Sequence, residues 1–91
     1  MKIYLKKFGT TLLSRSAGKE AYLAFLPTLG DVKPDETVEV DFEGVMTFSP
    51  SWGAEFFDPL RKKFPNRVVF INTENPSVKA TLELLEEIRE K

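Results

Sequence analysis

Apolar β-type runs alternate with amphipathic stretches along this chain, and that alternation limits the possible folds more than any other feature. Residues 37–42 place Val38, Val40 and Phe42 at every second position, which predicts a central strand. The run RVVFIN at residues 67–72 is typical of a parallel-sheet strand that is buried on both faces. Strand–helix–strand alternation favours parallel pairing with right-handed crossovers. The sequence therefore predicts a small α/β domain in the order ββαβαβα, with a mostly parallel sheet packed by helices.

The N-terminal residues predict a hairpin ahead of the parallel part. In MKIYLKKF, Ile3, Leu5 and Phe8 fall on one side and lysines on the other, as in a half-exposed strand. Gly9 offers a turn, and residues 10–13 (TTLL) are a plausible return strand.

Three amphipathic stretches predict helices, each with a polar residue placed to cap its first turn. Their expected starts are Ser14 or Ser16, Ser49–Pro50 and Asn75–Pro76. Their expected apolar faces are Ala21, Tyr22, Phe25, Leu26 and Leu29 in the first, Trp52, Phe56, Phe57 and Leu60 in the second, and Val78, Leu82, Leu85 and Ile88 in the third. Pro27 should end or kink the first helix, and Pro59 predicts a break or kink in the second.

Composition excludes several classes of function. The chain has 91 residues, which predicts one domain over residues 1–91, and it contains neither cysteine nor histidine. Thiolate and Ser–His nucleophiles, the usual zinc ligands and the standard proton shuttle are therefore absent, so we expect no enzyme, metal or cofactor. Asp41 and Glu43 leave carboxylate–Mg²⁺ chemistry open in principle. With a net charge of −1 and no long apolar run, we expect no nucleic-acid or membrane binding and a cytoplasmic location.

The segment TFSPSWGAEFF, residues 47–57, carries the sharpest functional hypothesis. Ser49 is the natural N-cap of the second helix because Pro50 occupies the first helical position. Ser51 is then not needed as a cap and falls in the first turn, where amides and the helix dipole favour negative charge. The residues leave two alternatives open for Ser51: an ordinary first-turn serine, or a phosphorylation switch.

The stretch VEVDFEGVMTFSPSWGAEFF resembles the strand–loop–helix core of STAS domains, which occur in sulfate transporters and anti-sigma factor antagonists. With Ser14–Arg15 before the first helix, the chain resembles more closely the short STAS-like family of unknown function. In the antagonists a serine of the corresponding loop is phosphorylated by a partner kinase. The resemblance implies that Ser51 is the phosphoacceptor, with Ser49 as the second candidate. Ser49 stands where the antagonists have an aspartate, and Trp52 where they have a glycine.

These observations predict a non-enzymatic regulatory module that binds a protein partner, either a kinase-like ATPase or another regulator, in a bacterial or phage-type system. The expected contact residues are Ser14, Arg15, Ser49, Ser51, Trp52 and Glu55. Two alternatives remain open for Arg15: an ion pair with a carboxylate such as Asp41 or Glu43, or contact with a phosphate or an acidic partner group. Trp52 is expected either in the core or as an interface anchor. The rival functions are a constitutive binding or inhibitor subunit and a nucleotide- or anion-binding domain. The sequence does not decide the oligomeric state.

Overall fold

The computed structural model describes residues 1–90 and contains a three-stranded parallel sheet. Its strands are β1 (Lys2–Tyr4), β3 (Val38–Asp41) and β5 (Val68–Ile71), in the order β1-β3-β5. Val40 lies opposite Ile3 on one side and Phe70 on the other. The predicted α/β class, the parallel pairing and the central position of the strand at residues 37–42 are confirmed.

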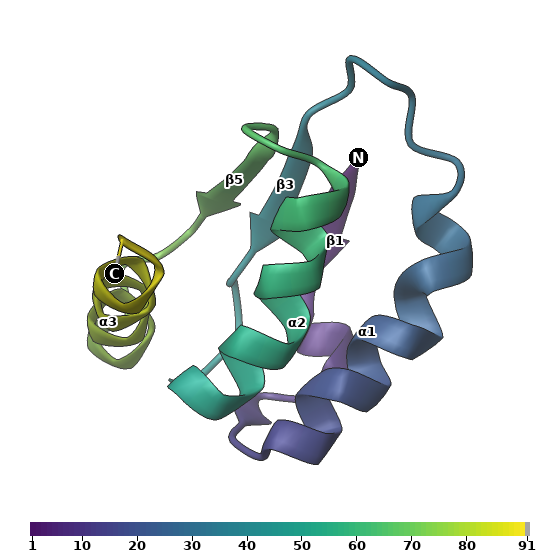
Figure 1. Ribbon diagram of the computed structural model, residues 1–91. Coiled ribbons are helices and arrows are strands. Elements are labelled where there is room, and N and C mark those ends of the chain that lie inside the picture. Colours follow the sequence, from purple (N-terminus) through teal and green to yellow (C-terminus); the bar gives the residue numbers. More distant parts are fainter. Residues whose placement is uncertain (91) are drawn as a thin grey trace.

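Helices cover one face of this sheet. The helices α1 (Arg15–Leu29) and α2 (Pro50–Lys63) pack side by side over it (Figure 1). α3 (Pro76–Glu90) packs against α2 and against the short strand β4 (Thr47–Phe48). Asn75 caps α3 as expected, because its side-chain oxygen accepts a hydrogen bond from the Ser77 amide at 2.8 Å. The arrangement leaves the opposite face of the sheet, which carries Lys2 and Tyr4, exposed.

The predicted N-terminal hairpin is wrong. Residues Leu5–Phe8 form a 3₁₀ helix, η1, which turns the buried Leu5 and the half-buried Phe8 toward the core. The next strand, β2 (Thr11–Leu12), pairs in parallel with β4 (Thr47–Phe48) and does not pair with β1. The short strand β4 was not expected, because two residues are too few to show a periodic pattern. These two strands form a second, separate sheet.

The prediction that residues 67–72 form a strand buried on both faces is also wrong. β5 is an edge strand, and Val69 is 45% exposed because it faces the side of the sheet that no helix covers. The apolar run is still explained, since Val68 and Phe70 point to the helical side along with Val38 and Val40.

Two prolines are accommodated within helices. α1 continues for two residues past Pro27, and α2 runs through Pro59 without the expected break. An interior proline costs a helix about 3 kcal/mol. Phe56, Phe57 and Leu60 are buried on both sides of Pro59, and we attribute the continuity of α2 to this packing.

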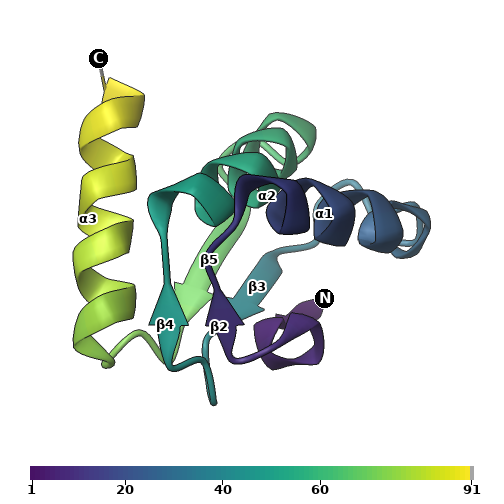
Figure 2. The ribbon, with the colours of Figure 1, turned by 90° about the horizontal axis from the view of Figure 1, so that it is seen from below.

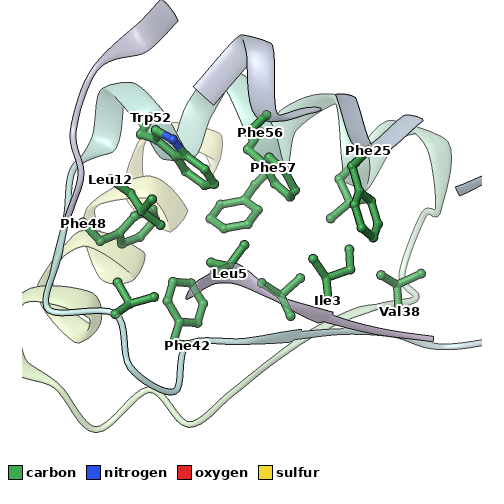
Figure 3. Close-up of a cluster of buried hydrophobic side chains, with 14 of the residues drawn as sticks. Ile3, Leu5, Leu12, Phe25, Val38, Phe42, Phe48, Trp52, Phe56 and Phe57 are labelled. Carbon is green, nitrogen blue, oxygen red and sulfur yellow. The ribbon is translucent and has the colours of Figure 1, made fainter. Parts of the chain in front are cut away.

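Aromatic side chains form the centre of the core, between the helices and the sheet (Figure 3). Trp52 stacks on Phe56 with ring centroids 4.9 Å apart and planes inclined by 13°. Phe57 contacts both of these rings edge-on and also Phe48 of β4. Phe57 also contacts Phe70 of β5, with ring centroids 5.1 Å apart, so one aromatic cluster anchors α2 to both sheets.

Candidate functional site

The starts of α1 and α2 lie together because β2 and β4 are parallel neighbours. Leu12 lies opposite Phe48 in this pair, and each strand leads directly into a helix (Figure 2). Ser14 caps α1 by accepting a hydrogen bond from the Ala17 amide at 3.1 Å. Ser49 caps α2 by accepting one from the Trp52 amide at 3.4 Å. Two capped helix starts therefore form one rim, which we call the capped rim, and the predicted cap role of Ser49 is confirmed.

Ser49 has a second structural role. Its hydroxyl donates a hydrogen bond to the carbonyl oxygen of Leu13, at 2.6 Å, and so ties the start of α2 to the residue before the α1 cap. The hydroxyl is thus used both as donor and as acceptor. Phosphorylation of Ser49 would remove its donor proton and disturb this connection, so Ser51 is the better placed of the two phosphoacceptor candidates.

Ser51 differs from Ser49 in the hydrogen bonding of its hydroxyl. It is half-buried in the first turn of α2, and its hydroxyl has no hydrogen-bond partner in the part of the chain that the structure describes. The first turn of α2 contains no acidic residue to balance the partial positive charge of its free amides. Ser51 also lines a groove of about 980 Å³, together with Arg15.

The two serines give a matched pair of stability predictions. We expect Ser49→Ala to lower the free energy of unfolding by about 1–3 kcal/mol, because the cap and the bond to Leu13 are both lost. We expect Ser51→Ala to change it by no more than about 0.5 kcal/mol. Urea denaturation followed by Trp52 fluorescence measures both. Equal losses for the two variants would contradict the assignment of Ser49 as the structural serine.

Arg15 is paired with a carboxylate, as one of the predicted alternatives has it, but the partner is Glu55 and not Asp41 or Glu43. Its Nη1 lies 3.0 Å from the Glu55 Oε1, while 67% of the arginine side chain remains exposed. The parallel strands β2 and β4 explain this pair, since they bring the first residue of α1 beside the first turns of α2. Glu55 follows Ser51 by one helical turn, so Arg15, Ser51 and Glu55 share the same side of the capped rim.

Trp52 is part of the core, with 1% of its surface exposed. The prediction that it contacts a partner therefore fails for the folded chain, and the core alternative is correct. The close approach of α1 explains its burial: a Cβ added at Gly18 would lie 2.5 Å from the Trp52 carbonyl oxygen. Gly18 is thus a point where the backbones of the two helices come very close together.

Asp41 is buried at the end of β3 and held by polar groups. Its Oδ1 accepts hydrogen bonds from the Asn72 side-chain amide at 2.8 Å and from the Glu43 backbone amide at 2.9 Å. The bond from Asn72, which outweighs the effect of burial, lowers the pKa of the Asp41 carboxyl. Among the side chains that the structure describes, residues 1–88, no three acidic groups come together in a cluster that could hold a metal ion. The carboxylate thus joins the ends of β3 and β5.

This lowered pKa predicts a pH dependence of stability. The contribution of Asp41 is complete above the ordinary aspartate pKa of about 3.9 and is lost as the pH falls through the lower pKa of the folded state. We expect Asp41→Asn to be less stable than the natural chain by about 1 kcal/mol at pH 7, because a charge-assisted bond becomes a neutral one. The difference should shrink in denaturation experiments below about pH 4. A constant difference over that range would contradict the prediction.

A protein-family model matches more than half of the chain. It is described as a STAS-like domain of unknown function, and it matches residues 17–78. The chain belongs to this STAS-like family. No curated protein and no solved structure matches the chain. The STAS-like match includes Ser49, Ser51 and Glu55, whereas Ser14 and Arg15 lie just before it. Over residues 1–90, no helix has the length and apolar character needed to cross a bilayer.

The groove beside Ser51 is the feature of this STAS-like domain that sequence reasoning missed. It follows one side of α2 and is bordered by β5 and α3. Ala54, Val68, Phe70, Leu85 and Ile88 supply its apolar lining. Hydrophobic periodicity identifies these faces as apolar, but it does not show that α2 and α3 leave space between them. In the sequence, the uninterrupted apolar run VVFI of β5 was the available signal for an apolar surface at this place.

Proposed function

We propose that this STAS-like domain is a non-enzymatic regulatory module that binds a protein partner at the capped rim, and that phosphate on Ser51 weakens this binding. One observation carries the proposal: Ser51 offers an unbonded hydroxyl on the first turn of α2, in the same groove as Arg15. The contact residues of the proposal are Ser14, Arg15, Ser49, Ser51 and Glu55, since Trp52 is buried.

The proposed switch follows from charge. A phosphoserine adds about −1.5 to −2 charges near neutral pH. At residue 51 this charge would lie one turn from the Glu55 carboxylate and in reach of the same first-turn amides that Ser49 caps. A partner surface that fits the unmodified rim would then have to desolvate an anion for which it carries no counter-group, which is unfavourable.

Affinity purification from the source cell, read by mass spectrometry, tests the proposal. We expect phosphate on Ser51 in part of the population, and a kinase-like ATPase or another regulator bound to the unmodified chain. Ser51→Glu should reduce the recovered partner by about tenfold or more relative to Ser51→Ala, since a misplaced charge costs over 1.4 kcal/mol. Ala24→Glu, on an exposed residue of α1 that lies more than two turns from the rim, is the control for added charge. Equal recovery with all three variants would refute the switch.

A constitutive binding or inhibitor subunit is the second candidate. Ser49 favours this candidate, because it stands where the antagonists have an aspartate. Its hydroxyl is already used in the α2 cap and in the hydrogen bond to the Leu13 carbonyl oxygen. This candidate predicts a stoichiometric partner in growth and in stress, with both serines unmodified. The nucleotide- or anion-binding alternative predicts thermal stabilisation by a nucleotide, about 2.7 kcal/mol at 100 times the dissociation constant.

A further inference from the structure

β5 has an outer edge that lacks the usual protection. It is the last strand on its side of the sheet, and its four residues, VVFI, contain no charge and no proline (Figure 1). Natural edge strands are usually blocked by lysines, prolines, bulges or covering segments, because their free amides can pair with another chain. The other edge strand, β1, carries Lys2.

The hydrogen bonds to β3 show which groups of β5 are unpaired. The Val38 amide donates to the Arg67 carbonyl oxygen at 2.8 Å, and the Phe42 amide donates to that of Ile71 at 3.1 Å. In a parallel ladder the N–H and C=O of one residue point to the same neighbour, and successive residues alternate. The amides and carbonyls of Val68 and Phe70 therefore point outward, and within residues 1–90 no backbone group pairs with them.

The same two residues line the groove. Val68 and Phe70 form its β5 side, Ala54 of α2 and Leu85 and Ile88 of α3 add apolar contacts, and the volume is about 980 Å³. The groove thus combines a row of unpaired backbone groups with an apolar lining. Arg15 and Arg61 of the lining are ion-paired with Glu55 and Glu86, and Lys62 and Asp58 carry opposite charges, so the lining is close to neutral. An apolar occupant of low net charge is therefore complementary to it.

We propose that the outer edge of β5 binds an extended segment of a partner protein, which adds to the sheet as a further strand. The segment has apolar side chains at alternating positions, which lie in the groove, and a low net charge. Main-chain hydrogen bonds to Val68 and Phe70 supply affinity, and the groove supplies selectivity. This site goes beyond the proposed function and does not depend on phosphate at Ser51.

Nuclear magnetic resonance on the isotope-labelled full chain tests the proposal. The probe is a peptide selected from a random displayed library against the immobilised chain. At saturation we expect hydrogen exchange of the Val68 and Phe70 amides to slow by about tenfold or more, because each gains a hydrogen bond. The Val69 and Ile71 amides already face β3 and serve as the internal control, with little change.

Methylation of the peptide backbone provides the matched control, because it leaves the protein untouched. Methyl groups on the peptide amides that face β5 should weaken binding by about tenfold or more. Methyl groups on the alternate amides should leave the affinity nearly unchanged. Failure to select any peptide, binding without protection of Val68 and Phe70, or equal effects of the two methylated peptides would overturn the proposal. If the Val68 and Phe70 amides became protected without peptide as the protein concentration is raised, the proposal would also be overturned. The occupant would then be a second copy of the chain.

Discussion

Trp52→Ala is expected to remove about 3–5 kcal/mol from the free energy of unfolding. The residue is almost fully buried, stacks on Phe56 and contacts Phe48 and Phe57 edge-on, so its removal leaves a large cavity in the aromatic cluster. The whole chain should be stable by roughly 5–14 kcal/mol on per-residue averages. The variant should therefore keep about 0–11 kcal/mol and unfold at a clearly lower urea concentration than the natural chain.

Urea denaturation followed by circular dichroism measures this loss, since the variant lacks the only tryptophan. Leu23→Ala is the control: the side chain is 54% exposed on α1, and we expect a change within about 0.5 kcal/mol. A loss of less than about 1 kcal/mol in Trp52→Ala would contradict the core assignment. The prediction also bears on partner binding, because a loss of binding in this variant would report unfolding and not a lost contact.

The sequence predicted those parts of the fold that depend on local chemistry. Ser49 and Asn75 cap helices as expected, because N-cap preference requires only a polar side chain next to free amides. The central strand at residues 37–42 was also predicted correctly, because alternation of Val38, Val40 and Phe42 is a local signal. The family match at residues 17–78 agrees with the resemblance that these segments showed.

Long-range pairing could not be predicted in the same way. Residues 10–13 have the composition of a strand, but nothing in them shows that β2 pairs with β4 and not with β1. The ion pair of Arg15 with Glu55 depends on that pairing, so it was assigned to the wrong carboxylates. The exposure of Val69 likewise depends on α1 and α2 lying on the same face of the sheet. Each error concerns a partner that is distant in sequence.

Gly18→Ala is expected to lower the free energy of unfolding by about 2 kcal/mol, although alanine is the better helix former. The added Cβ would lie 2.5 Å from the Trp52 carbonyl oxygen, 3.0 Å from its Cα and 3.1 Å from its carbonyl carbon. All three are backbone atoms, so no flexible side chain can move aside and the helices must separate. Overpacking typically costs about 1–3 kcal/mol, and an overlap with backbone atoms falls at the top of that range. Alanine returns about 1 kcal/mol of helix propensity, which leaves a net loss of about 2 kcal/mol.

Ser16→Ala is the matched control on the same helix, because Ser16 is exposed and the change should slightly stabilise α1. Both variants can be followed by Trp52 fluorescence during urea denaturation, and the Gly18 variant should also show altered fluorescence before unfolding. If Gly18→Ala were as stable as Ser16→Ala, the helices would not be in contact at this point. The separation would also move Arg15 away from Glu55 and Ser51, since both groups are carried by the starts of the helices that Gly18 holds together. Partner binding at the capped rim should therefore weaken in Gly18→Ala even where the chain is fully folded, whereas Ser16→Ala should bind normally.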